Sequence, residues 1–127
     1  MTPADFPRAF AIAFGMRDAE RLTQVLAEDV QVLTLTGATA EGRVAARAVL
    51  AAEFAGIFAR ARLVTGRMQM QPLAATVCLL NQRFVVSGAL GPDGRDLPRF
   101  AALLTVVLVT VPTGWQAACL NFSGLAE

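Results

Sequence analysis

The sequence contains no histidine and no tyrosine among its 127 residues. Without histidine there is no imidazole general base, no Ser–His or Cys–His nucleophile pair and no histidine ligand for a metal. Without tyrosine there is no phenol to donate a proton. An enzyme built on this chain would have to use carboxylates, arginines, amides or a borrowed cofactor, and we expect neither a metal site nor a resident cofactor.

Cysteine and basic clusters are also scarce. Cys78 and Cys119 are too few for a disulfide framework or a structural zinc site, and their apolar, strand-like surroundings predict buried free thiols. The aromatic residues are eight Phe and one Trp, and the net charge is +1 with the arginines spread along the chain. Nucleic-acid binding needs a basic surface with stacking rings, so we expect no nucleic-acid partner.

Long hydrophobic runs are missing although 55% of the residues are hydrophobic. The longest run, 100–112, is shorter than the roughly 20 residues that span a bilayer. The first residues lack the charge pattern and cleavage site of a signal peptide. These features predict a cytoplasmic, non-membrane protein with a single domain over residues 1–127. The surplus hydrophobic surface is most simply buried in a homodimer.

Helical patterns occupy the first half of the chain, and strand patterns occupy the second half. Phe6, Phe10 and Phe14 recur at a spacing of four and form one face of a helix. Asp18 can cap a second helix. The predicted elements are a helix that starts at residues 2–5, a helix from 18 to about 28, a strand at 30–36, a helix at 43–60, and strands at 63–71, 75–90, 100–111 and 115–123.

This order predicts an α+β fold in which four antiparallel strands follow the helices. The two central strands are apolar on both faces. In an antiparallel sheet one such face lies under the helices, and the other needs a partner. No segment is left over to cover the second face, so we expect a second copy of the chain to pack there.

The last predicted strand changes character along one face. This face begins at Trp115, continues through Ala117 and Cys119, and ends at Asn121 and Ser123. A strand of the core would stay apolar throughout, so the change from aromatic to polar predicts a half-wet pocket. Asn121 could orient a ligand carbonyl or hydroxyl, or it could be a strand-end amide satisfied by its neighbours.

Three signatures resemble the nuclear transport factor two-like superfamily, and the bacterial SnoaL-like and SgcJ/EcaC-like domains are the most similar branches. They are residues 10–18 running into 26–30, Thr36-Gly37 followed by Gly42-Arg43, and Gly114-Trp115-Gln116. The resemblance implies a cystatin-like cone, in which a curved antiparallel sheet wraps around three helices and leaves a cavity at its wide end. It also implies dimerisation through the outer face of the sheet.

The catalytic groups of the ketosteroid isomerase branch do not carry over. By this resemblance its tyrosine falls at Phe10 and its two carboxylates fall at Thr34 and at or near Thr105. The dehydratase branch relies on His and Tyr, which are absent. No acidic residue lies in a predicted strand. Glu53 lies inside the long predicted helix, where a solvated charge pairing with Arg60 is the simpler explanation.

We therefore predict a small-molecule-binding domain with an apolar pocket and no buried carboxylate. Whether Gln82 or Arg83 faces the pocket depends on the strand register. The predicted ligand-binding residues lie on the pocket wall or rim: Phe10, Phe14, Thr34, Phe54, Arg83, Arg99, Thr105, Trp115, Cys119 and Asn121.

Two alternatives stay open at this point. The chain could be an enzyme of secondary metabolism, such as an isomerase, a cyclase or an oxidoreductase of the SnoaL or SgcJ type. It could also be a dimeric interaction module, whose interior would be filled and would lack the roughly 300 Å³ cavity of a ligand site.

Overall fold

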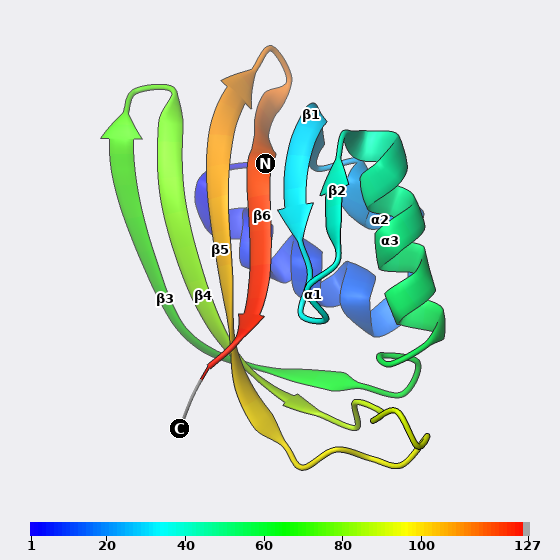
Figure 1. Ribbon diagram of the computed structural model, residues 1–127. Helices are drawn as coiled ribbons and strands as arrows, with labels where there is room; N and C mark the ends of the chain where they lie inside the picture. Colours follow the sequence, from blue (N-terminus) through cyan, green and yellow to red (C-terminus); the bar gives the residue numbers. More distant parts are fainter. Residues whose placement is uncertain (126–127) are drawn as a thin grey trace.

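A computed structural model describes residues 1–125, so the acidic residue Glu127 in the tail lies outside the described part. Within these residues, three α-helices pack against one sheet of six strands, two of which (β1 and β2) come before the third helix in the chain, and this is the α+β architecture predicted from the sequence (Figure 1). The elements are a 3₁₀ turn (Pro3–Asp5), α1 (Phe6–Met16), α2 (Ala19–Thr23), β1 (Leu26–Leu33), β2 (Thr39–Glu41), α3 (Arg43–Ala55), β3 (Arg62–Ala74), β4 (Val77–Ser87), β5 (Phe100–Val111) and β6 (Gly114–Gly124).

The sheet has the strand order β2-β1-β6-β5-β4-β3 and curves around the helices. All neighbouring strands are antiparallel except β1 and β6, which are parallel, with Val32 opposite Leu120. The fully antiparallel sheet expected from the sequence is therefore wrong at this one pair. Four strands separate β1 from β6 along the chain, so no hairpin turn sets their relative direction.

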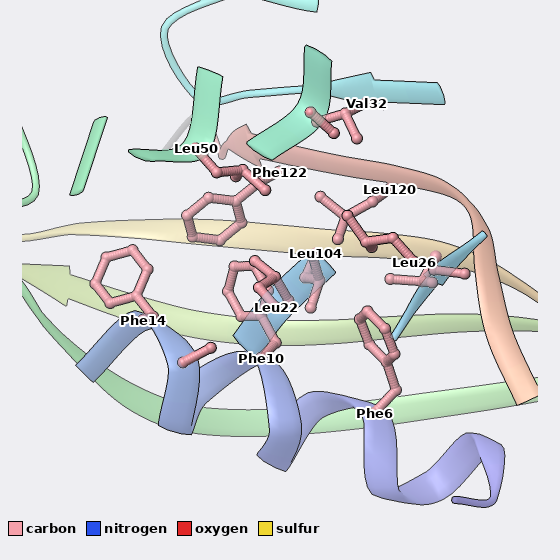
Figure 2. Packing of buried hydrophobic residues seen from close by; sticks show 14 of the residues in the cluster. Phe6, Phe10, Phe14, Leu22, Leu26, Val32, Leu50, Leu104, Leu120 and Phe122 are labelled. Atoms are coloured by element: carbon pink, nitrogen blue, oxygen red, sulfur yellow. The ribbon is translucent and has the colours of Figure 1, made fainter. Parts of the chain in front are cut away.

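Helix α1 lies across the concave face and supplies the aromatic centre of the core. Figure 2 shows Phe6, Phe10 and Phe14 projecting from α1 toward the sheet, where they meet Phe122 and Leu120 of β6. The Phe10 and Phe122 ring centroids are 5.3 Å apart in an edge-to-face arrangement. The spacing of four seen in the sequence therefore produces the predicted buried helix face.

Arg17 ends α1 and anchors it to the segment that leads into β3. Its φ of 57° is in the left-handed region, which is uncommon for a residue other than glycine. The guanidinium offsets this strain because it donates to the carbonyl oxygens of Phe14 (2.6 Å), Ala59 (3.0 Å) and Ala61 (2.6 Å). Three charge-assisted hydrogen bonds thus fix the C-terminal end of α1.

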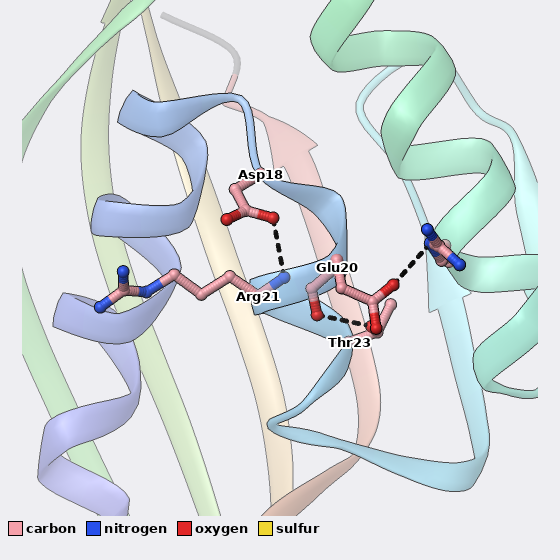
Figure 3. A network of polar contacts seen from close by, with 5 residues as sticks. Asp18, Glu20, Arg21 and Thr23 are labelled. Carbon is pink, nitrogen blue, oxygen red and sulfur yellow. Dashed lines mark hydrogen bonds and ion pairs between the residues drawn. The ribbon is translucent and has the colours of Figure 1, made fainter.

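Helix α2 is short, and polar contacts hold it in place (Figure 3). Asp18 Oδ1 accepts from the backbone N–H of Arg21 at 3.0 Å, which confirms the predicted cap. The carboxylate of Glu20 pairs with Arg47 on α3 at 2.8 Å, so the two helices are tied together. The Thr23 hydroxyl donates to the carbonyl oxygen of Glu20 at 2.8 Å and closes the last turn.

Three predicted boundaries are wrong. The second helix ends at Thr23 because Leu26 already pairs with Ala117 in the sheet, and tertiary pairing overrides the helical pattern beyond it. Helix α3 ends at Ala55 because Gly56 leaves the helical conformation. The first strand covers Leu26–Leu33 instead of 30–36, so Glu28 and Asp29 lie in a strand. A short strand that was not predicted, β2, follows it at Thr39–Glu41. None of the helices within residues 1–125 is long and hydrophobic enough to cross a bilayer.

Candidate functional site

A small cavity lies between the concave side of the sheet and helices α1 and α3. Its volume is ≈ 10 Å³, which is about the space that one water molecule occupies. The ring centroid of Phe14 lies 5.0 Å from that of Phe58 and 5.6 Å from that of Phe54. Aromatic side chains in contact therefore fill most of the interior. The cavity is lined by Phe10, Phe14, Thr34, Leu50, Glu53, Phe54, Phe58, Leu120 and Phe122.

The prediction of a pocket without a buried carboxylate is wrong, because Glu53 lines this aromatic cavity with only 9% of the residue exposed. Its Oε2 accepts a hydrogen bond from the Thr36 hydroxyl at 2.6 Å, and the Thr36 hydroxyl lies 3.2 Å from that of Thr34. Both threonines follow β1, which ends at Leu33, and precede β2. A chain of two hydroxyls therefore connects this β1–β2 turn to the carboxylate on α3.

The predicted pairing of Glu53 with Arg60 is wrong. Arg60 Nη2 contacts Asp96 Oδ1 at 2.7 Å on the surface. Helix α3 ends before Arg60, so the helical spacing that would bring the two side chains together does not extend that far. Glu53 follows Leu50 by three residues and belongs to the buried stripe of α3. That spacing was the sequence signal that could have identified it.

No cation neutralises Glu53 within the part of the chain that the structure describes. The ion pairs there join Arg47 to Glu20, Arg60 to Asp96 and Arg95 to Asp93. Within residues 1–125 no side chain or backbone N–H donates to Glu53 Oε1, and no fully buried side-chain oxygen lacks a partner. Oε1 therefore keeps some contact with solvent and can accept a hydrogen bond, hold a cation or take a proton.

Four of the predicted pocket residues, Phe10, Phe14, Thr34 and Phe54, do come together around this cavity. Thr105, Cys119 and Asn121 do not, and their predicted placement on the cavity wall is wrong. Thr105 stands between Asn81 and Asn121 in the cross-strand register. The inward positions of β6 are those of the buried residues Leu120 and Phe122. Cys119 and Asn121 therefore point outward, and Thr105 and Asn81, which are aligned with Asn121, lie on the same outer face.

A β-bulge in β6 explains this reversal. Leu108 pairs with Ala117 and Val107 pairs with Cys119, so Ala118 is an extra residue in the strand. One extra residue moves all later side chains to the opposite face. The face that begins at Trp115 is therefore interrupted at Ala118.

The polar residues on the outer face satisfy one another. The Thr105 hydroxyl donates to Asn81 Oδ1 at 2.6 Å. The Cys119 thiol donates weakly to Asn121 Oδ1 at a sulfur–oxygen distance of 3.8 Å. Cys119 is only half-buried, whereas Cys78 is the buried free thiol that was predicted.

The three remaining predicted residues lie away from the cavity. Arg83 is exposed on the outer face of β4 and Gln82 is buried on the inner face, which answers the question of register. Arg99 is exposed in the loop before β5, and Trp115 packs against the margin of the core. Sequence reasoning missed Glu53 and Thr36 as site residues.

Comparison with known proteins supports the fold. No protein-family model and no curated protein sequence matches the chain. Among solved structures, an uncharacterised cystatin-like protein from Caulobacter vibrioides has a TM-score of 0.89 at 18% identity and covers 98% of this chain and 87% of its own. LinA has a TM-score of 0.84 at 15% identity, with coverage of 97% and 83%.

A third structure, a nuclear transport factor two-like protein with a cystatin-like fold from Novosphingobium aromaticivorans, has a TM-score of 0.75 at 19% identity. It covers 97% of this chain and 79% of its own. At such identities the likeness shows the fold alone. The chain thus has a cystatin-like fold of the kind found in nuclear transport factor two-like proteins, and the predicted fold is confirmed.

Proposed function

We propose that this protein binds a small, mainly apolar molecule at the wide end of the cone, and that the ligand presents an N–H or O–H donor to Glu53. The observation that carries the proposal is a carboxylate that is nine-tenths buried among phenylalanines and has no cation beside it among the described residues. A buried charge without a partner is destabilising, and natural proteins retain such groups mainly where function requires them.

The surroundings of Glu53 have the composition of a ligand site. Aromatic rings supply apolar walls, and a few polar groups (Glu53, Thr34 and Thr36) could fix the orientation of a guest. The present cavity of ≈ 10 Å³ is far below the roughly 300 Å³ of a ligand site, and such a filled interior is what the interaction-module alternative predicts. A guest therefore enters only if some of the rings rotate. The ligand donor would occupy Oε1, while Thr36 remains on Oε2.

The test is an NMR titration with three probes of one shape: benzylamine, benzyl alcohol and benzoate. We expect the amine and the alcohol to shift the backbone resonances of residues 34–37 and of α3, because both donate hydrogen bonds. Benzoate should cause no shift, because its charge repels Glu53. E53Q should weaken benzylamine binding about 10-fold or more, since charge-assisted hydrogen bonds are the strong ones.

E28Q is the matched control, because Glu28 is exposed on β1 and takes part in none of the ion pairs described above. It should bind benzylamine as the wild type does. The proposal fails if neither benzylamine nor benzyl alcohol causes a shift at millimolar concentration, or if E53Q and the wild type bind benzylamine equally.

A second candidate function is catalysis with Glu53 as a general base. Composition removes imidazole and phenol from this chain, and Glu53 supplies a carboxylate in a mostly apolar cavity, where it could abstract a proton from a bound guest. If it acts in this way, the wild type should accelerate deuterium exchange at the α-carbons of phenylacetone in D₂O, as measured by ¹H NMR. E53Q should lose about 100-fold of that acceleration. No acceleration by the wild type leaves the binding function alone.

We also propose that the protein acts as a homodimer that pairs through the outer face of the sheet. Outward-pointing apolar side chains on β4 and β5 remain half-exposed in the single chain, including Leu79, Leu103 and Val107. L103E should convert the dimer to a monomer in light scattering, because it would bury a charge in the interface. V44E, at a residue of α3 that is 88% exposed and away from the outer face of the sheet, should leave the mass unchanged. A wild-type monomer would refute the proposal.

A further inference from the structure

A second depression lies on the other flank of α1, between that helix and the inner face of the β3–β4 edge of the sheet. Its volume is ≈ 590 Å³, in the range of small-molecule sites. It shares no lining residue with the aromatic cavity. We call it the α1–β3 groove, and it is lined by Ala4, Pro7, Arg8, Ala11, Ile12, Thr65, Gly66, Met68 and Gln82.

Gln82 is a polar residue in the floor of this groove, and only 2% of it is exposed. Its amide nitrogen lies 3.0 Å from the carbonyl oxygen of Gly66, 3.4 Å from that of Arg67 and 2.9 Å from that of Arg83. The register between β3 and β4 shifts between Thr65 and Met68, so a bulge takes the first two carbonyls off the ladder. The nitrogen of Gln82 thus has a structural role.

The oxygen of the same amide has no such role. Within residues 1–125 no group donates to Gln82 Oε1, and no fully buried side-chain oxygen lacks a partner. Oε1 is therefore reachable from outside, and the α1–β3 groove is the opening that this side chain lines. A flipped amide would set the oxygen against three carbonyl oxygens, so the hydrogen bonds fix its direction.

The rest of the groove is apolar, with one cation at its rim. Ile12 and Met68 face it and are 37% and 40% exposed. Arg8 is exposed and forms none of the ion pairs among residues 1–125. The nearby carboxylate of Asp5 is occupied by the backbone N–H and the hydroxyl of Thr2.

From this arrangement we infer that the α1–β3 groove is a binding site for small amphipathic monocarboxylates that also carry an N–H or O–H donor. The donor binds Gln82 Oε1, the carboxylate pairs with the guanidinium of Arg8, and the apolar body lies on Ile12 and Met68. An N-acyl amino acid has all three features. The site does not involve Glu53 and stands independently of the function proposed above.

The probes are N-hexanoylglycine, N-hexanoyl-β-alanine and N-hexanoyl-4-aminobutyrate, which place the carboxylate at increasing distances from the amide N–H. We expect at least one of them to shift the backbone resonances of residues 7–12 and 65–68 in an NMR titration. Two derivatives of the best probe should each bind about 10-fold more weakly than the probe itself. Its methyl ester loses the carboxylate charge, and methylation of its acylated nitrogen removes the N–H donor.

On the protein side, R8Q should weaken the best acid about 10-fold but leave its methyl ester unaffected. R95Q, at an exposed arginine of the loop before β5, is the control and should bind as the wild type does. E53Q should also bind normally. Gln82 is left unchanged, because its nitrogen holds the bulge and its replacement would disturb the sheet.

The inference is overturned if none of the three acids shifts residues 7–12 and 65–68 at millimolar concentration. It is also overturned if the acid, the ester and the N-methyl amide bind equally, because Arg8 and Gln82 would then contribute nothing. Shifts confined to the aromatic cavity would place the acids in the other site and refute it as well.

Discussion

Polar side chains on the two sides of the sheet differ in how completely the fold supplies their hydrogen-bond partners. On the outer face, the Thr105 hydroxyl donates to Asn81, and Asn121 accepts from Cys119. On the inner face, Glu53 has one donor, Thr36, and no cation among the described residues. The outer contacts join Thr105 of β5 to Asn81 of β4 and Cys119 to Asn121 within β6, and they account for these side chains as parts of the sheet. The inner group is under-satisfied, and this contrast favours Glu53 as a binding residue.

The side-chain amide of Gln82 shows the same contrast between its nitrogen and its oxygen. The nitrogen of Gln82 satisfies the carbonyls of a bulge, whereas its oxygen accepts from none of the described residues, and the side chain lines the α1–β3 groove. A polar group that is fully paired within the fold needs no ligand to account for it. A buried group that is only partly paired points to a molecule that completes it.

The largest expected effect on the free energy of unfolding follows from removing an aromatic ring from the core. F14A removes a ring that contacts Phe10, Phe54, Phe58 and Phe122, and it should lower the free energy of unfolding by about 3–5 kcal/mol. Urea denaturation measures the loss. M16A on the same helix is the control, because Met16 is 57% exposed and its change should have little effect. Equal losses in both variants would mean that the aromatic cluster is not the core.

The next effect tests the hydrogen bond between Thr36 and Glu53. T36V should lower the free energy of unfolding by about 1.5–3 kcal/mol, because it removes the donor that residues 1–125 supply to a buried carboxylate. In the E53Q background the same change should cost less, because a neutral amide is cheaper to leave unpaired. A double-mutant cycle in urea gives the coupling. Additive losses would show that the two side chains do not interact in solution.

A smaller effect is expected on the outer face. T105V removes the hydrogen bond to Asn81 and should lower the free energy of unfolding by about 0.5–1.5 kcal/mol. T110V is the matched control, because Thr110 is exposed on the same strand and its side chain forms none of the hydrogen bonds described above. If T105V proves as damaging as T36V, the supposed difference between the two faces disappears.

The smallest effect concerns Asp5, an exposed carboxylate that contrasts with Glu53. The Thr2 backbone N–H, and then the Thr2 hydroxyl, hold the pKa of Asp5 below its usual value. A lowered pKa in the folded state adds stability above the pKa of the unfolded chain, about 3.9, and that stability is lost as the pH falls. The urea midpoint of the wild type should therefore drop more than that of D5N between pH 5 and pH 3. Parallel curves would contradict this.

The fold could largely be predicted from local patterns. The spacing of Phe6, Phe10 and Phe14 predicted α1 and its buried face, and Asp18 predicted the start of α2. Both central strands appeared at nearly their observed positions. These features succeed because side-chain periodicity and helix caps depend on residues close together in the sequence.

The candidate site could be predicted only in part. Phe10, Phe14, Thr34 and Phe54 were placed correctly around the cavity. Asn121 was assigned to the wrong face because the bulge at Ala118 has no clear sequence signature, and a single extra residue reverses the alternation. The other predicted binding residues, including Arg83 and Arg99, remain predictions with respect to any ligand.

By itself, the sequence determined the apolar helix face, the alternation of the strands and the absence of imidazole and phenol chemistry, because each follows from residue identity and local spacing. The tertiary structure alone decided that Glu53 is buried without a cation from residues 1–125, that aromatic rings fill the interior and that Gln82 lines a groove. Burial and pairing arise between segments distant in the chain, and strand register and bulges set them.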